Sequence, residues 1–575
     1  DAVQRDLREV AGTSVLIYDQ TCAAEKRRRR KKGQFPDPKK RVVINEAVCE
    51  GCGDCSVQSN CLSVLPKETE FGRKRSIDQA SCNKDFSCVK GFCPSFVTVE
   101  GTDLRPAQTA EAATTRPPEP DLPSLHRPWN IVLTGIGGTG VVTVSAVLGM
   151  AAHLEGKGCS VFNLSGMAQK FGPVMSHVRI GSQQEDIHTP RVAAGDADLL
   201  MGCDLVVSAS DEALGKVSVG RSHAVINDFE APTAGFVQNR DMVFPAAAMK
   251  ERIARESGEE RAHFVNATRL AEELLGDPIA ANMLLMGYVW QKGLIPISLA
   301  AIERAIELNK VAVRFNLDAF EWGRRVAHDP MAGISKAPVE TVFKPEAAPL
   351  SALIDRRADF LVSYQNEAYA RRYREFVELV CEKEEAQFGS DRDMVFSRSV
   401  AEGLFRLMAY KDEYEVARLY TSGDFSRNLG KQFAGKPRLT FHLAPPLISK
   451  RDPHTGHLIK QEFGPWIMPV FKVVAKLKVL RGSRWDIFGY TAERKMERQL
   501  VEEYQALIVS LLPDFRAGNY DAALALAKLP QDMRGFGHVK ENNVRKARQR
   551  QQALLAQFRA EDVKPEPVRI VEVAG

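Results

Sequence analysis

The chain has 575 residues, of which 44% are hydrophobic and 26% charged, and its formal net charge at pH 7 is +5. This length corresponds to about three or four domains, and the charge is too small for this size to indicate a particular partner. No apolar stretch approaches the roughly 18 to 20 residues of a membrane span, and no targeting peptide is recognisable. We therefore expect a cytoplasmic protein with no membrane partner.

Residues 1–46 have the pattern of a domain tail followed by a basic segment. A polar, helix-like stretch leads into an apolar run, Ser14–Tyr18, with the composition of a β-strand. Because the chain starts at Asp1 inside this apparent tail, we expect a fragment or a processed piece. Seven consecutive basic residues follow, Lys26–Lys32. They form either a solvated, flexible run or a patch that steers an acidic electron carrier or a polyphosphate cofactor.

Residues 47–100 contain seven of the eleven cysteines of the chain. Each of two sets has three positions spaced as in CxxCxxC and one more distant member, which is the spacing of iron–sulfur ligands. In two-cluster ferredoxins the distant cysteine, followed by proline, binds the other cluster, and Pro94 follows Cys93. This crossed pattern predicts one [4Fe–4S] site at Cys49, Cys52, Cys55 and Cys93, and a second site at Cys82, Asp85, Cys88 and Cys61.

The second set departs from the ferredoxin pattern at Asp85, where a carboxylate replaces a thiolate. A carboxylate is a harder ligand that prefers other metals, so this site holds a labile iron, a [3Fe–4S] cluster or no cluster. A zinc knuckle is a weaker alternative, since zinc usually takes two separated CxxC pairs. A disulfide framework is weaker still in a large chain without a secretory signal.

A proline-rich linker, residues 101–128, precedes a predicted α/β domain over residues 129–330. Hydrophobic patterns predict strands and helices that alternate along this domain. The predicted strands are Ile131–Thr134, Ser160–Leu164 and Leu205–Ser208, and the predicted helices are Val141–Leu154, Ala280–Trp290 and Leu299–Ile306. Residues 331–575 are charged and have mainly helical patterns. No nucleic-acid module accompanies the basic stretches, so we expect no nucleic-acid partner.

A glycine-rich loop follows the first predicted strand of this domain. Its backbone amides and the start of the next helix suit a phosphate group, and the glycines are Gly135, Gly137, Gly138 and Gly140. An NAD site also requires an acidic residue at the end of the second strand, and that strand ends in Asn163 and Leu164. The alternative is structural, with glycines that only permit a tight turn and close helix packing.

Several segments together resemble the fused indolepyruvate ferredoxin oxidoreductases, thiamine-dependent members of the 2-oxoacid:acceptor oxidoreductases. These segments are VCEGCGDCSVQSNC, SCNKDFSCVKGFCPSF, GIGGTGVV, SGMAQKFGPVMSHVRI, GDADLLMGCDLVV and ANMLLMGYVWQKGLIP. The resemblance covers nearly the whole chain, and the cysteine module is its most specific part. It implies a multidomain α/β fold: the truncated tail of a thiamine-type domain, a two-cluster ferredoxin-like module, a Rossmann-like γ domain over residues 129–330, and a helical C-terminal domain of unknown function.

The resemblance implies oxidative decarboxylation of an aryl 2-oxoacid to an acyl-coenzyme A, with electrons passed through iron–sulfur clusters to ferredoxin. It places a coenzyme A phosphate at Gly135, Gly137, Gly138, Gly140 and Arg179, although Arg179 serves equally well as a structural hydrogen-bonding residue. The GDG sequence of the thiamine diphosphate and magnesium site is absent from the chain. We therefore expect a separate N-terminal thiamine-binding half or subunit as partner, assembly as a homo-oligomer, and no decarboxylation by this chain alone.

Two other functions compete with this interpretation. The chain could be a stand-alone ferredoxin-like electron carrier or scaffold fused to a phosphate-binding domain, or an NAD-linked oxidoreductase. Neither of these functions requires a thiamine-binding partner. No residue of the chain is assigned a catalytic role on its sequence.

Overall fold

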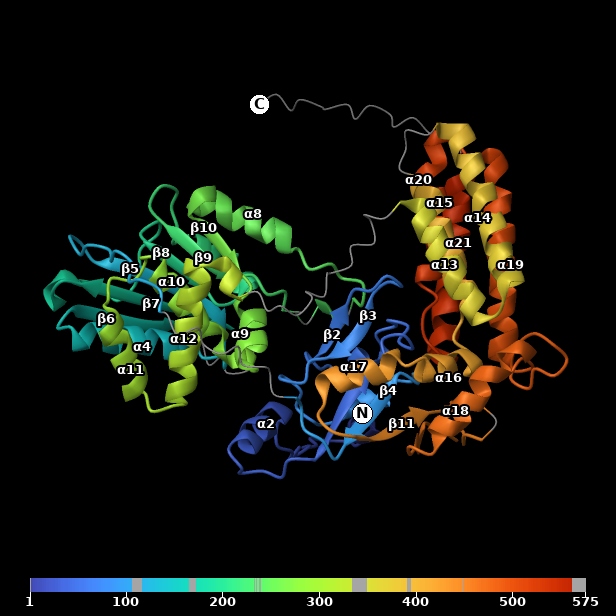
Figure 1. Ribbon diagram of the computed structural model, residues 1–575, viewed down its shortest axis with the longest axis horizontal. Coiled ribbons are helices and arrows are strands. Elements are labelled where there is room, and N and C mark those ends of the chain that lie inside the picture. Colours follow the sequence, from blue (N-terminus) through green and yellow to red (C-terminus); the bar gives the residue numbers. More distant parts are fainter. Residues whose placement is uncertain are drawn as a thin grey trace. The chain divides into compact units, whose positions relative to one another are not determined.

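The computed structural model describes residues 2–105, 116–164, 172–231, 233, 235–236, 239–333, 349–389, 394–446, 448–453 and 455–560. The chain folds into two compact units (Figure 1). One unit combines Asp1–Leu104 with Val342–Gly575, and the other comprises Arg105–Thr341. The cysteine module and the C-terminal region therefore belong to the same unit, although the central domain separates them in sequence. No helix in the described ranges has the length and apolar character needed to cross a bilayer.

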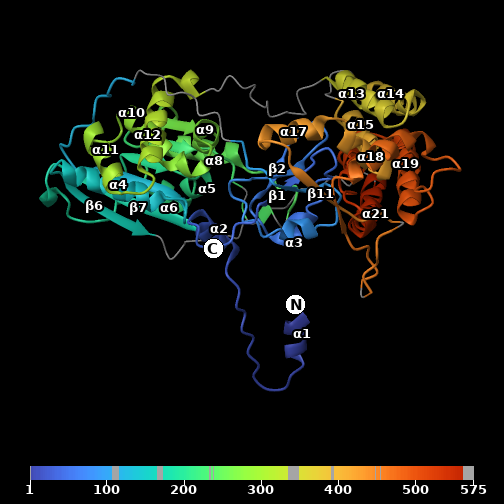
Figure 2. The ribbon, with the colours of Figure 1, turned by 60° about the horizontal axis from the view of Figure 1, so that its bottom comes forward.

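The N-terminal segment contains two helices, α1 (Ala2–Arg8) and α2 (Ala23–Lys31), the second of which carries most of the basic run. The strand predicted at Ser14–Tyr18 is wrong, because these residues have no regular structure. A strand needs a neighbouring strand for its backbone hydrogen bonds, and no strand in the described part of the chain pairs with this run. Figure 2 shows the run as an extended loop leading from α1 to α2.

The cysteine module contains a pair of antiparallel strands and a small hairpin. The antiparallel pair is β1 (Lys40–Ile44) with β4 (Phe96–Glu100), and the hairpin is β2 (Val64–Lys67) with β3 (Lys74–Ile77). Two short helical segments hold cysteines between these strands, α3 (Asp54–Ser59) and the 3-10 helix η1 (Ser87–Lys90).

The sheet of the cysteine module continues into the C-terminal region. Strand β11 (Arg438–Leu443) pairs antiparallel with β4, and β12 (Gln461–Phe463) pairs with β11. The order of the sheet is β1-β4-β11-β12. Its core mixes side chains from both regions, with Val97 and Val99 packed among Tyr420 and Phe441. The two regions therefore share one hydrophobic core and are not independent domains joined by a tether.

The C-terminal region is otherwise helical, as the hydrophobic pattern predicts. Three helices, α16 (Glu413–Thr421), α17 (Asp424–Gln432) and α18 (Ile467–Lys476), contribute to the core of the sheet. The other helices form a bundle around a second core. These helices are α13 (Leu350–Tyr364), α14 (Glu367–Phe388), α15 (Val395–Met408), α19 (Ala492–Leu511), α20 (Tyr520–Ala527) and α21 (Gly537–Arg559).

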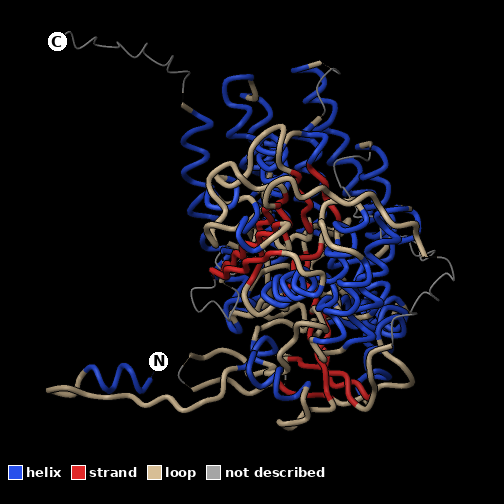
Figure 3. The backbone as a smooth tube through the Cα atoms, turned by 90° about the vertical axis from the view of Figure 1, so that its left-hand side faces the viewer, coloured by secondary structure: helices blue, strands red, loops and turns tan. Residues whose placement is uncertain are grey.

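The central unit is built on a six-stranded mixed sheet with the order β10-β9-β8-β5-β7-β6. Strands β5, β8, β9 and β10 run parallel, whereas β7 is antiparallel to both β5 and β6. Figure 3 shows the strands in red among the helices. The strands are β5 (Trp129–Ile136), β6 (Gly158–Leu164), β7 (Pro173–Gly181), β8 (Leu199–Gly202), β9 (His223–Asn227) and β10 (Ala262–Val265).

The helices of the central unit largely match the predicted ones. Helix α4 spans Val141–Leu154, and α10 and α11 lie within a residue or two of their predicted bounds. The helices are α4, α5 (Leu205–Ser208), α6 (Asp211–Leu214), α8 (Ala246–Ser257), α9 (Ala267–Leu275), α10 (Ala281–Gln291), α11 (Leu299–Leu308) and α12 (Val313–His328).

The strand predicted at Leu205–Ser208 is wrong, because these residues form helix α5. The strand ends earlier, at Gly202, and the side chain of Asp204 caps the helix by accepting a hydrogen bond from the amide of Val207 at 2.8 Å. A short run of apolar residues does not by itself distinguish a buried strand from a buried helix. The capping aspartate is the local signal that favours the helix.

The second half of the predicted linker lies against the central unit. The Nη2 of Arg324 donates to the carbonyl of Pro117 at 2.8 Å, and the Nε2 of Gln291 donates to the carbonyl of Pro118 at 2.7 Å. Pro117 and Pro118 therefore lie against α12 and α10, and further along the segment Arg127 pairs with Asp198 beside β8 at 2.6 Å. Residues 106–115 of the predicted linker lie outside the described residues.

Candidate functional site

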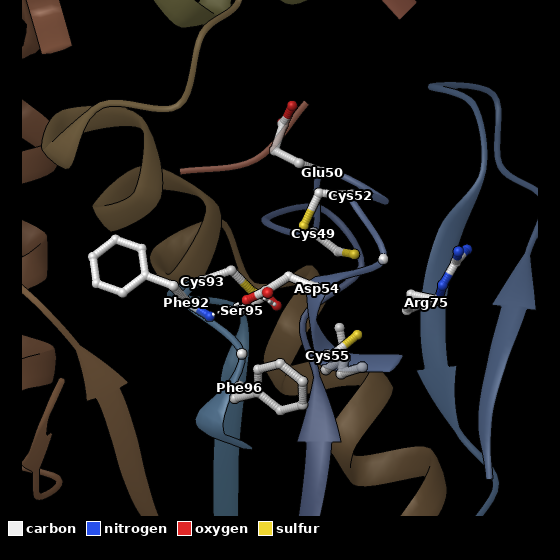
Figure 4. A pocket seen from close by; sticks show the side chains of 13 residues that line it. Cys49, Glu50, Cys52, Asp54, Cys55, Arg75, Phe92, Cys93, Ser95 and Phe96 are labelled. Atoms are coloured by element: carbon white, nitrogen blue, oxygen red, sulfur yellow. Dashed lines mark hydrogen bonds between the residues drawn. The ribbon is translucent and has the colours of Figure 1, made fainter. Parts of the chain in front are cut away.

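Four cysteines lie around one pocket in the cysteine module, and we call this space the cysteine pocket. Cys49 and Cys52 come from the loop after β1, Cys55 from α3, and Cys93 from the turn before β4. Figure 4 shows their side chains around the pocket, with Phe92 on one side and Arg75 on the other. The structure thus brings Cys93 to the three cysteines of the first CxxCxxC run, and not to the run that precedes it in sequence.

Glycines allow the chain to approach itself closely around the cysteine pocket. Gly51 has a φ of +65°, and a Cβ at this position would lie 2.1 Å from the carbonyl oxygen of Arg73. A Cβ on Gly91 would lie 3.0 Å from the Cα of Cys55. Larger residues at these two positions would push the cysteine loops away from β3 and α3.

Burial raises the pKa of the Cys52 thiol, and the nearby Cys93 and Cys49 raise it further. The pKa of Cys55 is also raised by burial and then by the neighbouring Cys49 and Cys52. Several thiolates crowded into a buried space repel one another, so the charged forms require a cation between them. Metal binding supplies that charge and releases the thiol protons.

The second set also lies together, although its fourth member differs from the others. Burial raises the pKa of Cys88 to about 12, and Cys82, Cys61 and Asp85 add to the shift. Asp85 is exposed, and its carboxylate accepts a hydrogen bond from the Ser87 hydroxyl at 2.9 Å. The carboxylate is therefore held by a neighbouring side chain at the solvent boundary.

The four thiols of the first set suit an iron–sulfur cluster, and the second set offers three thiols with the Asp85 carboxylate. The amide of Gly51 donates to the sulfur of Cys49 at 3.3 Å, and the amide of Lys84 donates to the sulfur of Cys82 at 3.4 Å. Such amide-to-sulfur hydrogen bonds are among the features that set cluster potentials. Within the described ranges, no three His, Cys, Asp or Glu side chains are grouped so that they could hold a metal ion. A four-iron cluster is larger than one ion, so its four ligands surround a space and do not meet at a point.

The glycine loop of the central unit makes mainly internal contacts. The amide of Gly137 donates to the carbonyl of Gly172 at 2.7 Å, and the Nδ2 of Asn282 donates to the carbonyl of Thr139 at 2.9 Å. A Cβ on Gly135 would lie 2.5 Å from the Cγ2 of Val141. These contacts favour the structural role of a tight turn and close helix packing for Gly135 and Gly137. They leave Gly138 and Gly140, whose φ angles are +86° and +98°, as the better candidates for binding a phosphate.

Arg179 is a buried residue of β7 with internal hydrogen-bonding partners. Its Nε donates to the Oδ1 of Asn130 at 2.8 Å, and its Nη1 donates to the carbonyl of Thr189 at 2.8 Å. These hydrogen bonds fit the alternative given in the sequence analysis, in which Arg179 is a structural hydrogen-bonding residue. The role of Arg179 in binding coenzyme A stays a prediction.

The C-terminal region supplies residues near the cysteines that the sequence did not indicate. Lys411 donates to the carbonyl of Cys49 at 3.3 Å, Tyr420 donates to that of Pro94 at 2.6 Å, and Lys460 donates to that of Gly91 at 2.7 Å. These donors are more than 300 positions away from their acceptors in sequence. No local motif marks such partners, because contacts between segments far apart in sequence bring them together.

Two regions of the chain match family models. Residues 130–326 match pyruvate ferredoxin/flavodoxin oxidoreductase, and residues 350–553 match a family of unknown function, DUF6537. The indolepyruvate oxidoreductase subunit IorB of Pyrococcus horikoshii is 29% identical over 204 residues, which cover 35% of this chain and 96% of that protein. The pyruvate/ketoisovalerate oxidoreductases common subunit gamma of Thermococcus litoralis is 28% identical over 195 residues, which cover 32% of this chain and 92% of that protein.

Among solved structures, the pyruvate oxidoreductase subunit PORC of Thermotoga maritima matches with a TM-score of 0.26 and 21% identity, over 35% of this chain and 96% of that chain. The matched sequences define the central unit as a domain of the oxidoreductase type, and both of these relatives are named as subunits. Residues 130–326 therefore form a domain similar to those of the 2-oxoacid:ferredoxin oxidoreductases. The family resemblance found in the sequence is thereby confirmed.

Proposed function

We propose that this chain is the electron-transfer and γ portion of an oxidoreductase that converts an aryl 2-oxoacid, such as indolepyruvate, to its acyl-coenzyme A in the cytoplasm. The observation that carries the proposal is the grouping of Cys49, Cys52, Cys55 and Cys93 around one buried pocket. The indolepyruvate oxidoreductase subunits among the relatives support the class of reaction. Residues 47–100 act as the ferredoxin-like module and residues 129–330 as the γ domain.

The two cysteine sets are the residues that would hold the iron–sulfur clusters. When bound, such clusters supply one-electron transfer at a potential that the surrounding protein tunes. Around the pocket, Arg75 is 1% exposed and contributes a buried positive charge near Cys55 and Cys49. A positive charge at this position offsets the negative charge of the thiolates.

The reaction requires components that this chain does not supply. Thiamine diphosphate and magnesium belong to a partner, the N-terminal thiamine-binding half or subunit, of which residues 1–46 include the tail. Coenzyme A binds at the γ domain with Gly138 and Gly140 near a phosphate, and ferredoxin takes the electrons. Residues 101–128 link the cysteine module to the γ domain, and the largely helical C-terminal region, within residues 331–575, completes the sheet and core of the cysteine module. We infer a homo-oligomer of such assemblies.

Iron and sulfide analysis of the anaerobically purified chain tests this function. We expect about seven or eight irons per chain, as for two clusters, and low-temperature electron paramagnetic resonance signals after reduction with dithionite. Adding the thiamine-binding portion should then give arylpyruvate-dependent reduction of a viologen dye. Protein that holds no iron after anaerobic reconstitution would refute the electron-transfer role.

Replacing Asp85 with cysteine is expected to complete the ligand set of the second site. A thiolate binds cluster iron more strongly than a carboxylate does, so iron content should rise by about one atom per chain as a three-iron centre becomes a cubane. The spectrum of the oxidised protein should correspondingly lose its three-iron signal. Asp78→Cys, which places a thiol outside both sets, is the control and should leave the iron content unchanged. An identical spectrum in D85C and the wild type would contradict the assignment of Asp85 to this site.

A further inference from the structure

The C-terminal region reaches both cysteine sets through one lysine. The Nζ of Lys460 donates to the carbonyl of Val89 at 3.0 Å and to that of Gly91 at 2.7 Å. Val89 directly follows Cys88 of the second set, and Gly91 lies two residues before Cys93 of the first set. The ammonium group of Lys460 is therefore held between the ligands of two separate sites.

The position of Lys460 is set by the shared sheet. Lys460 directly precedes β12, which pairs with β11, and β11 in turn pairs with β4 of the cysteine module. Its Nζ also lies 5.2 Å from the ring centroid of Phe96, the first residue of β4. These contacts place the ammonium group of Lys460 at one position relative to the cysteines.

The charge of Lys460 acts on cysteines of both sets. Burial lowers the pKa of Lys460, and Cys93, Asp54, Cys88 and Cys55 oppose this shift when they are in their charged forms. Lys411 differs in this respect, because its Nζ is paired with the carboxylate of Glu50 at 2.6 Å. Its positive charge is therefore largely compensated, whereas Lys460 donates hydrogen bonds to two uncharged backbone carbonyls.

We propose that Lys460 raises the reduction potential of the centres at both cysteine sets, and that setting this potential is a function of the C-terminal region. Reduction adds one negative charge to a centre, so a fixed positive charge beside it stabilises the reduced state. The effect is larger where water is partly excluded, because the effective dielectric constant is lower there. This proposal rests on the proposed electron-transfer function. It assigns a role to residues of the C-terminal region, whose matching family, DUF6537, is one of unknown function.

Potentiometric titration of the anaerobic full chain, followed by electron paramagnetic resonance, tests the role of Lys460. We expect Lys460→Gln to keep its iron and to show lower midpoint potentials for the signals of both sets. At the midpoint potential of the wild type, the fraction of reduced centres in the Lys460→Gln variant should be several-fold smaller. Lys460→Arg keeps the charge and should restore midpoints close to those of the wild type. Lys436→Gln removes an exposed lysine of the same region and should leave both midpoints unchanged.

Each contrary result has a distinct meaning. Unchanged midpoints in iron-replete K460Q would overturn this proposal and leave the proposed function intact. Should K460Q lose iron, Lys460→Met takes its place, because methionine retains an unbranched side chain that can pack on Phe96. Loss of iron in both variants would mean that Lys460 holds the ligand loops in place and does not tune them, which also overturns the proposal. Absence of iron in the wild type would refute the proposed function itself.

Discussion

Replacing Cys93 with serine is expected to remove the centre at the first cysteine set and to leave that at the second. Cys93 lines the pocket of Cys49, Cys52 and Cys55 although it follows the second CxxCxxC-like run in sequence. A serine hydroxyl is a poor substitute for a thiolate toward iron, so about half of the bound iron should be lost. Iron analysis and electron paramagnetic resonance of the reduced chain measure both the loss and the signal affected.

Matched cysteine variants decide which set Cys93 serves. Cys49→Ser should remove the same signal as Cys93→Ser, whereas Cys61→Ser should remove the other one. Cys159→Ser is the control, because Cys159 lies in β6 of the central unit and outside both sets. If C93S removed the signal that C88S removes, the ligands would follow the order of the sequence and the crossed grouping would be wrong.

The parts of the fold that the sequence predicted well are those determined by local signals. Helix α4 has the predicted bounds because Gly140 adopts a left-handed conformation directly before an apolar run that ends at Leu154. A local feature also indicates that Cys93 belongs with the first three cysteines. This feature is Pro94, which directly follows Cys93. Spacing and turn chemistry are properties of a few adjacent residues, and a single sequence contains them.

The parts that could not be predicted depend on contacts between distant segments. Residues 438–443 have no pattern that tells whether they pair within the C-terminal region or with β4, yet the pairing with β4 completes the sheet of the cysteine module. It also brings Lys460 to Gly91, from 369 positions away. Conversely, Ser14–Tyr18 has the composition of a strand, but strand composition produces a strand only where a neighbouring strand offers hydrogen bonds.

Replacing Asp412 with alanine is expected to cause a large loss of stability in the C-terminal region. The carboxylate of Asp412 accepts hydrogen bonds from the Nε and Nη2 of Arg481 at 2.6 and 2.9 Å, and both side chains are 3% exposed. Without Asp412 the guanidinium stays buried without its counter-charge, which typically costs about 3–5 kcal/mol. Asp412 also caps α16, and that contribution is lost as well.

Urea unfolding followed by far-ultraviolet circular dichroism measures this effect as a lower midpoint. Because the chain contains two compact units, midpoints compare the variants more safely than a single free energy of unfolding does. Asp424→Ala is the matched control: its partner Arg427 is 70% exposed and Asp424 itself 65%, so the loss should stay below about 1 kcal/mol. Equal midpoints for D412A and D424A would show that Arg481 finds other partners or water.

The Asp412 substitution should also affect the cysteine pocket, because α16 carries Tyr420, whose hydroxyl donates to the carbonyl of Pro94 beside Cys93. A loosened start of α16 weakens the placement of this tyrosine, and the loop that holds Cys93 loses a hydrogen bond to the C-terminal region. We therefore expect D412A to lose iron at a lower urea concentration than the wild type, with the signal of the first set affected before that of the second. Simultaneous loss of both signals would indicate that the shared sheet unfolds as one cooperative unit.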